Sequence, residues 1–126
     1  MSFRFEKLNV WQDARVFVNH IYAITRKFPR DEKFGLIDQL RRAALSVILN
    51  IAEGSDRKSD AEFKRFLRMA ITSVEEVVTG LYIALDQKYI TQNQFEKLYL
   101  EANQLVARIN ALIKSLSVQK TVDSGQ

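Results

Sequence analysis

The side chains that most often do chemistry in enzymes are scarce in this sequence. It has one histidine, His20, and no cysteine, so a thiolate nucleophile and a cysteine-ligated metal are excluded. Two carboxylates at suitable spacing could act as acid and base, but Glu75 and Glu76 are adjacent and would point about 100° apart on a helix. Glu-x-x-His pairs, glycine-rich phosphate loops and the Gly-x-Ser-x-Gly motif are absent. We therefore expect no enzyme, no metal and no cofactor, with the two glutamates at the surface and His20 in solvent or at an interface.

Basic residues are the ones that cluster. The densest group is Arg57, Lys58, Lys64, Arg65 and Arg68. On a helix, Lys64 and Arg65 each lie within one turn of Arg68, so they would share an exposed surface. Such a surface could bind the phosphates of a nucleic acid, with no base-specific contact that the sequence can show.

A second basic group flanks Pro29 and consists of Arg26, Lys27, Arg30 and Lys33. Acidic residues interrupt both groups, among them Asp31, Asp56 and Glu62. The alternative interpretation of each group is therefore a solvated surface of mixed charge.

Length and composition fit one soluble globular domain. The chain has 126 residues, of which 47% are hydrophobic and 27% charged. Its formal net charge is +4, and 14 of its 19 basic residues lie in the first 70 positions. The N-terminal segment MSFRFEKLNVW lacks the apolar core of a secretory signal, and the longest nearly apolar stretch, residues 43–52, is too short to span a bilayer. We expect a cytoplasmic protein.

Apolar residues recur at alternating steps of three and four in four segments, which predicts four amphipathic helices. The stripes start at Val10, Ile37, Phe63 and Phe95 and end at Phe28, Ile51, Ala84 and Leu116. Short connections between them predict an all-α, up-down-up-down antiparallel four-helix bundle. We place an N-terminal arm at 1–8, the bundle at 9–117 and a flexible C-terminal tail at 118–126.

Helix boundaries are marked by small and capping residues. Gly54 is predicted to end the second helix as its C′ glycine. Ser59 with Glu62, and Thr91 with Gln94, have the spacing of capping boxes at the starts of the third and fourth helices. Gly35 and Gly80 are predicted to lie inside helices.

The second helix has more apolar surface than one bundle stripe needs. Leu45, Leu49 and Ala52 lie to one side of the core positions, which indicates either a central helix of a compact monomer or a subunit interface. Its polar residues form a narrow stripe, interpreted as a buried hydrogen-bond network or as a binding groove: Gln39, Arg42, Ser46, Asn50 and Glu53. Arg41 is predicted to form an ion pair at the interface, with Asp38 as a possible partner. The predicted subunit interface comprises Arg41, Arg42, Leu45, Leu49, Asn50 and Glu53.

Several of these residues stand in blocks whose spacing is specific. They are Leu8-x-Val10-Trp11, Phe28-Pro29, Gln39-x-Arg41-Arg42-Ala43, Ser46, Asn50-Ile51-Ala52-Glu53-Gly54, Arg57, Phe63-x-x-Phe66-Leu67, Ala70 and Ser73-x-Glu75-Glu76. Over residues 5–117 the chain resembles the bacterial 23S ribosomal RNA intervening-sequence protein family, which is related to the accessory variability protein of diversity-generating retroelements. The resemblance implies a four-helix bundle that assembles into a homopentameric ring without enzymatic activity. The accessory relatives have a basic surface, associate with nucleic acid and partner a reverse transcriptase.

Two functional hypotheses remain open at this point. In the first, a non-catalytic oligomer binds RNA, or RNA and DNA, through a repeated basic surface formed by Arg57, Lys58, Lys64, Arg65 and Arg68. In the second, the oligomer is a protein-interaction scaffold, such as an accessory subunit of a reverse transcriptase, and binds no nucleic acid directly.

Overall fold

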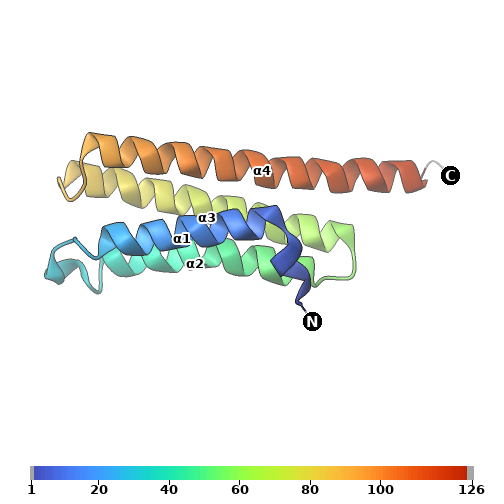
Figure 1. Cartoon of the computed structure of the whole chain (residues 1–126), viewed down its shortest axis with the longest axis horizontal. Helices are drawn as coiled ribbons and strands as arrows, with labels where there is room; N and C mark the ends of the chain where they lie inside the picture. The colour runs from blue at the N-terminus through green and yellow to red at the C-terminus, as the bar shows by residue number, and fades with distance from the viewer. Residues whose placement is uncertain (1, 125–126) are drawn as a thin grey trace.

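The computed structural model describes residues 2–124, with side chains as far as Ser117. This part of the chain contains four α-helices and no strand: α1 (Asn9–Thr25), α2 (Leu36–Ser55), α3 (Asp60–Asp86) and α4 (Gln92–Ser124). Two short 3-10 helices, η1 (Arg4–Lys7) and η2 (Arg30–Glu32), precede α1 and α2. Successive helices run antiparallel and lie side by side (Figure 1). The all-α, four-helix prediction is confirmed.

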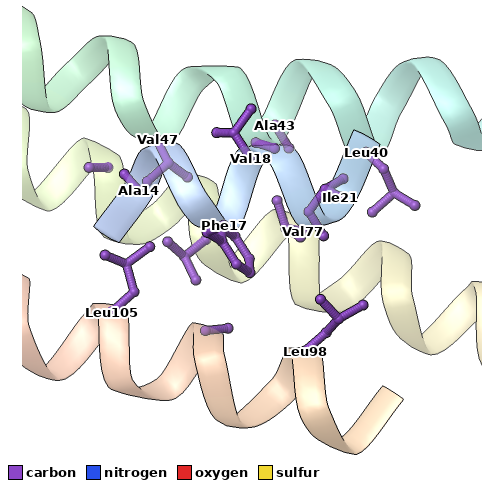
Figure 2. Packing of buried hydrophobic residues seen from close by; sticks show 14 of the residues in the cluster. Ala14, Phe17, Val18, Ile21, Leu40, Ala43, Val47, Val77, Leu98 and Leu105 are labelled. Atoms are coloured by element: carbon purple, nitrogen blue, oxygen red, sulfur yellow. The ribbon is translucent and has the colours of Figure 1, made fainter. Parts of the chain in front are cut away.

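The predicted apolar stripes form the core. Phe17 and Ile21 of α1 are fully buried, and Figure 2 shows Phe17 between α3 and α4, close to Val77 and Leu105. Small residues alternate with these large ones, for example Ala14, which is also fully buried. This alternation lets the side chains of four helices interdigitate around one axis.

The most extensive contact between helices is that of α2 with α3, and glycines at this contact leave room for the neighbouring side chains. Gly54 is buried inside α2, and a Cβ atom there would lie 2.7 Å from the Cβ of Phe66. Gly80 of α3 faces Leu40 in the same way, at 2.5 Å from a methyl group. The C′ prediction for Gly54 is therefore wrong, since α2 continues to Ser55 and no described glycine has a positive φ.

The connection between α1 and α2 corrects one further glycine prediction. Gly35 is the N-cap residue of α2 and lies outside the helix. Phe63, the first residue of the predicted α3 stripe, is half-buried and packs against the core, and Phe66, three residues on, is buried as well. Gly80 lies inside α3 as predicted.

The helix starts follow the predicted capping chemistry. Thr91 Oγ1 accepts from the Gln94 backbone N–H at 3.1 Å, and Gln94 Oε1 accepts from the Thr91 N–H at 2.8 Å. This is a complete capping box. Ser59 Oγ accepts from the Glu62 N–H at 3.1 Å, while the Glu62 carboxylate accepts from Arg65 instead of completing the box.

The N-terminal arm folds across one end of the bundle. Phe5 packs between Phe3 and Trp11, with ring centroids 5.7 and 4.8 Å away, and Arg4 donates to the carbonyl of Ser55 at 3.4 Å. The arm thereby links the start of α1 to the end of α2. The predicted tail, 118–126, has its side chains outside the described residues, although the backbone of α4 extends to Ser124. No helix in the described chain is long and apolar enough to cross a membrane.

Candidate functional site

Five predicted phosphate-binding residues meet where α2 passes into α3, and we call them the α2–α3 basic cluster: Arg57, Lys58, Lys64, Arg65 and Arg68. Arg57 and Lys58 belong to the connection, and the others to the first turns of α3. All are exposed except Lys64, which is half-buried. The prediction that the cations of α3 face solvent is confirmed for Arg65 and Arg68, whereas Lys64 is half-buried and contacts α4.

Two arginines of the cluster stack on one ring. The guanidinium carbons of Arg57 and Arg65 each lie 4.7 Å from the centroid of Phe66, a cation–π arrangement. Both are also paired, Arg57 with Glu53 at 2.6 Å and Arg65 with Glu62 at 2.9 Å. These contacts fix the two guanidinium groups and offset their charge.

The contact between Arg65 and Glu62 also shifts the titration of both groups. The hydrogen bond from Arg65 lowers the pKa of the Glu62 carboxyl, and the same bond raises the pKa of the Arg65 guanidinium. Glu62 therefore stays ionised at neutral pH and competes with any phosphate for Arg65.

The other three cations of the cluster differ in whether another side chain of the protein binds them. Lys64 donates to Ser117 Oγ of α4 at 3.0 Å. Lys58 and Arg68 are exposed and have no acidic partner among residues 2–117. They are the members of the cluster that are open to an external anion.

The polar stripe of α2 is in part a hydrogen-bond network between helices. Ser46 Oγ and Ser73 Oγ share a hydrogen bond of 2.8 Å across the α2–α3 contact, and Asn50 donates to both the carbonyl and the hydroxyl of Ser46. Gln39 is exposed at the other end of the stripe. The network interpretation therefore holds for Ser46 and Asn50.

The expected partner of Arg41 is wrong. Asp38 lies near Arg42, at 3.9 Å, whereas Arg41 turns toward α1. Arg41 donates from Nε to Thr25 Oγ1 at 2.9 Å and from Nη2 to the carbonyl of Tyr22 at 3.3 Å, and it stacks 4.6 Å from the Tyr22 ring. Arg41 therefore caps the C-terminal end of α1 in the same chain, where a cation interacts favourably with the helix dipole.

The excess apolar surface of α2 is exposed in the protomer. Leu49 is 62% and Leu45 37% exposed, and Phe3 of the arm, which lines the same groove as Leu49, is 71% exposed. The single chain does not cover these side chains, so the central-helix interpretation does not account for them. Whether a second copy covers them stays a prediction.

Residues 6–111 match the family described as 23S rRNA-intervening sequence protein. The chain belongs to this family. No curated protein matches the chain. Among solved structures, a protein of unknown function from the S23 ribosomal protein family of Bacteroides thetaiotaomicron is similar, with a TM-score of 0.74 at 23% identity over 83% of this chain and 98% of that one. That likeness shows a shared fold.

This member of the 23S rRNA-intervening sequence family places its single histidine on the surface. His20 Nδ1 lies 2.6 Å from Glu101 Oε2, so the pair links α1 to α4. Glu75 and Glu76 are exposed, as predicted. No group of three or more potential metal ligands occurs in the described part of the chain.

One feature of this family member was missed by sequence reasoning. Phe34 sits beside the second basic group and is 88% exposed, although nothing in the apolar pattern assigned it a place. The sequence does contain a signal for an aromatic ring among cations. Phe34 directly follows Lys33 and lies one helical turn before Ile37, where the α2 stripe starts.

Proposed function

We propose that this protein is a non-catalytic, oligomeric nucleic-acid-binding protein that contacts phosphates through the α2–α3 basic cluster. The observation that carries the proposal is the presence of two exposed, unpaired cations, Lys58 and Arg68, beside two arginines that are held in place by Phe66. Fixed guanidinium groups lose little freedom on binding, and unpaired cations release counterions from phosphates.

Oligomerisation is part of the proposal because one cluster is small. The exposed face of α2, formed by Leu45 and Leu49, is the surface through which copies associate. A ring would repeat the basic cluster once per subunit, and binding of several clusters to one strand would add through effective concentration. The family resemblance favours a pentamer.

The competing function is that of a scaffold for a partner protein. It is favoured by the carboxylates of Glu53 and Glu62, which offset two of the five cations. In that case the exposed α2 face, and not the cluster, would carry the interaction.

A salt series separates the two functions. Binding to a labelled structured RNA and to duplex DNA is measured by anisotropy for the wild type, for K58Q/R68Q and for the matched control R15Q/K97Q, which removes two exposed charges elsewhere. We expect K58Q/R68Q to lower the slope of log affinity against log salt by about 0.9 per lost phosphate contact on duplex, and the control to leave it unchanged. Equal slopes for all three proteins would exclude the cluster, and absence of binding at low salt would favour the scaffold.

A further inference from the structure

The connection between α1 and α2 lies at the end of the bundle opposite the α2–α3 connection (Figure 1). It carries a second group of cations beside an exposed aromatic ring. Arg26, Lys27, Arg30 and Lys33 are all exposed, and none has an acidic partner among residues 2–117. Phe34, at 88%, is the most exposed large apolar side chain in the same range. This end therefore has more cations without an acidic partner than the α2–α3 basic cluster, and an exposed aromatic ring.

The turn that displays Phe34 is built from both connections at this end. Glu32 Oε1 accepts from the Leu36 N–H at 3.1 Å, and Glu32 Oε2 accepts from the Tyr89 hydroxyl at 2.8 Å. The Tyr89 ring packs 5.3 Å from Phe28. The backbone N–H groups of Lys33 and Gly35 donate to the carbonyls of Arg30 and Glu32, each at 3.0 Å. A hydrogen-bonded turn thus holds Phe34 with its ring exposed to solvent.

We propose that this end of the bundle binds single-stranded nucleic acid, with one base stacked on Phe34 and neighbouring phosphates on Arg30 and Lys33. Lys33 Nζ lies 5.4 Å from the Phe34 centroid over one face of the ring. The high exposure of Phe34 leaves the other face open to a base. An aromatic ring among cations is the combination that binds single strands without sequence preference.

The geometry favours a strand over a lipid surface. Interfacial membrane binding uses a wide apolar helix face, and η2 has only three residues, none of them apolar. Stacking needs only one ring face. A duplex would also be a poor ligand, because its bases are already stacked on one another.

This site lies apart from the α2–α3 basic cluster, so its test does not depend on the proposed function. Binding of a labelled oligouridylate and of an abasic strand of equal length is measured by anisotropy for the wild type, F34L, F34W and R30Q/K33Q. Each change is also made in the K58Q/R68Q background, which removes the open cations at the far end. Because Phe34 is exposed, F34L should fold normally, and its melting temperature serves as the check.

We expect F34L to weaken oligouridylate binding about tenfold and F34W to retain it, because each base stacked on an aromatic ring contributes substantially to affinity. On the abasic strand F34L should match the wild type. R30Q/K33Q should lower the salt slope by about 1.4, or about 0.7 for each phosphate contact on a single strand.

Three results would overturn this inference: equal oligouridylate affinity of F34L and the wild type, an equal loss on both strands, or Phe34-dependent binding to anionic vesicles without binding to the oligonucleotide. If K58Q/R68Q alone abolishes nucleic-acid binding while F34L has no effect, the proposed function stands and this site does not.

Discussion

At the scale of single residues, Glu32 connects three parts of the chain through one carboxylate. Hydrogen bonds from the Leu36 N–H and the Tyr89 hydroxyl lower the pKa of Glu32 below its ordinary value of 4.5. A carboxyl group whose folded pKa is lowered stabilises the protein at pH values above its unfolded pKa, and this stabilisation is lost as the pH falls through the folded pKa. We therefore expect the wild type to lose stability as the pH falls below the ordinary carboxyl pKa of 4.5, and E32Q to lose less over the same range. Urea unfolding at a series of pH values measures both. The pKa of Glu62 is also lowered, but Glu62 is present in both proteins, so the difference between them isolates Glu32. Parallel curves for the two proteins would contradict the assignment.

Single residues also show which features could be predicted from the sequence and which could not. The exposure of Arg65 and Arg68 could be predicted because helical spacing places them off the core stripe of α3. The pairing of Glu32 with Tyr89, 57 residues apart, could not, because no local pattern records a contact between two connections. Arg41 was misjudged for a related reason. Its nearest acid along the helix is Asp38, but its actual partners belong to α1 and become neighbours only when the helices pack.

At the scale of helices, the contact between α2 and α3 depends on Gly54. An added Cβ atom would lie 2.7 Å from the Cβ of Phe66, so the helices must separate locally.

Alanine has a higher helix propensity than glycine by about 1 kcal/mol, which alone would stabilise α2. Overpacking a tight contact typically costs about 1 to 3 kcal/mol, so we expect G54A to be less stable than the wild type. Thermal and urea unfolding measure the change, and T72A, on the exposed side of α3, is the control. A G54A protein more stable than the wild type would show that the contact is not limiting.

The helices themselves were predictable, since steps of three and four repeat through each segment and the buried residues follow them. Gly54 was misassigned because a glycine followed by polar residues after an apolar run is the usual sign of a helix end. Its actual role depends on Phe66 of the next helix. The periodicity of a helix can be recognised from its own segment. A contact between two helices depends on both segments, so neither segment alone predicts it.

At the scale of the whole molecule, the number of helices could be predicted from the sequence, but not the number of subunits. Heptad-like stripes specify how four helices of one chain meet and contain no information on how many chains assemble. The structure adds one constraint, because Leu45 and Leu49 stay exposed after the chain has folded. An interface at this face would bury them, and burial of a leucine side chain stabilises by about 1.5 to 3 kcal/mol.

Two leucines of similar exposure on different helices permit a test of the interface with a matched control. Leu49 of α2 is 62% exposed and Leu100 of α4 is 58% exposed, so a charge at either position should leave the folded protomer intact. If copies associate through α2, L49D places an unpaired carboxylate in an apolar interface and should reduce the assembly to monomers, whereas L100D should keep the wild-type mass. Sedimentation velocity or light scattering measures the mass of each protein, and circular dichroism confirms that both are helical. A wild-type monomer would show that the face has another partner. Loss of assembly in L100D but not in L49D would place the interface on α4 instead of α2. The basic clusters of the assembled copies would then be arranged around an α4 interface when they bind one strand.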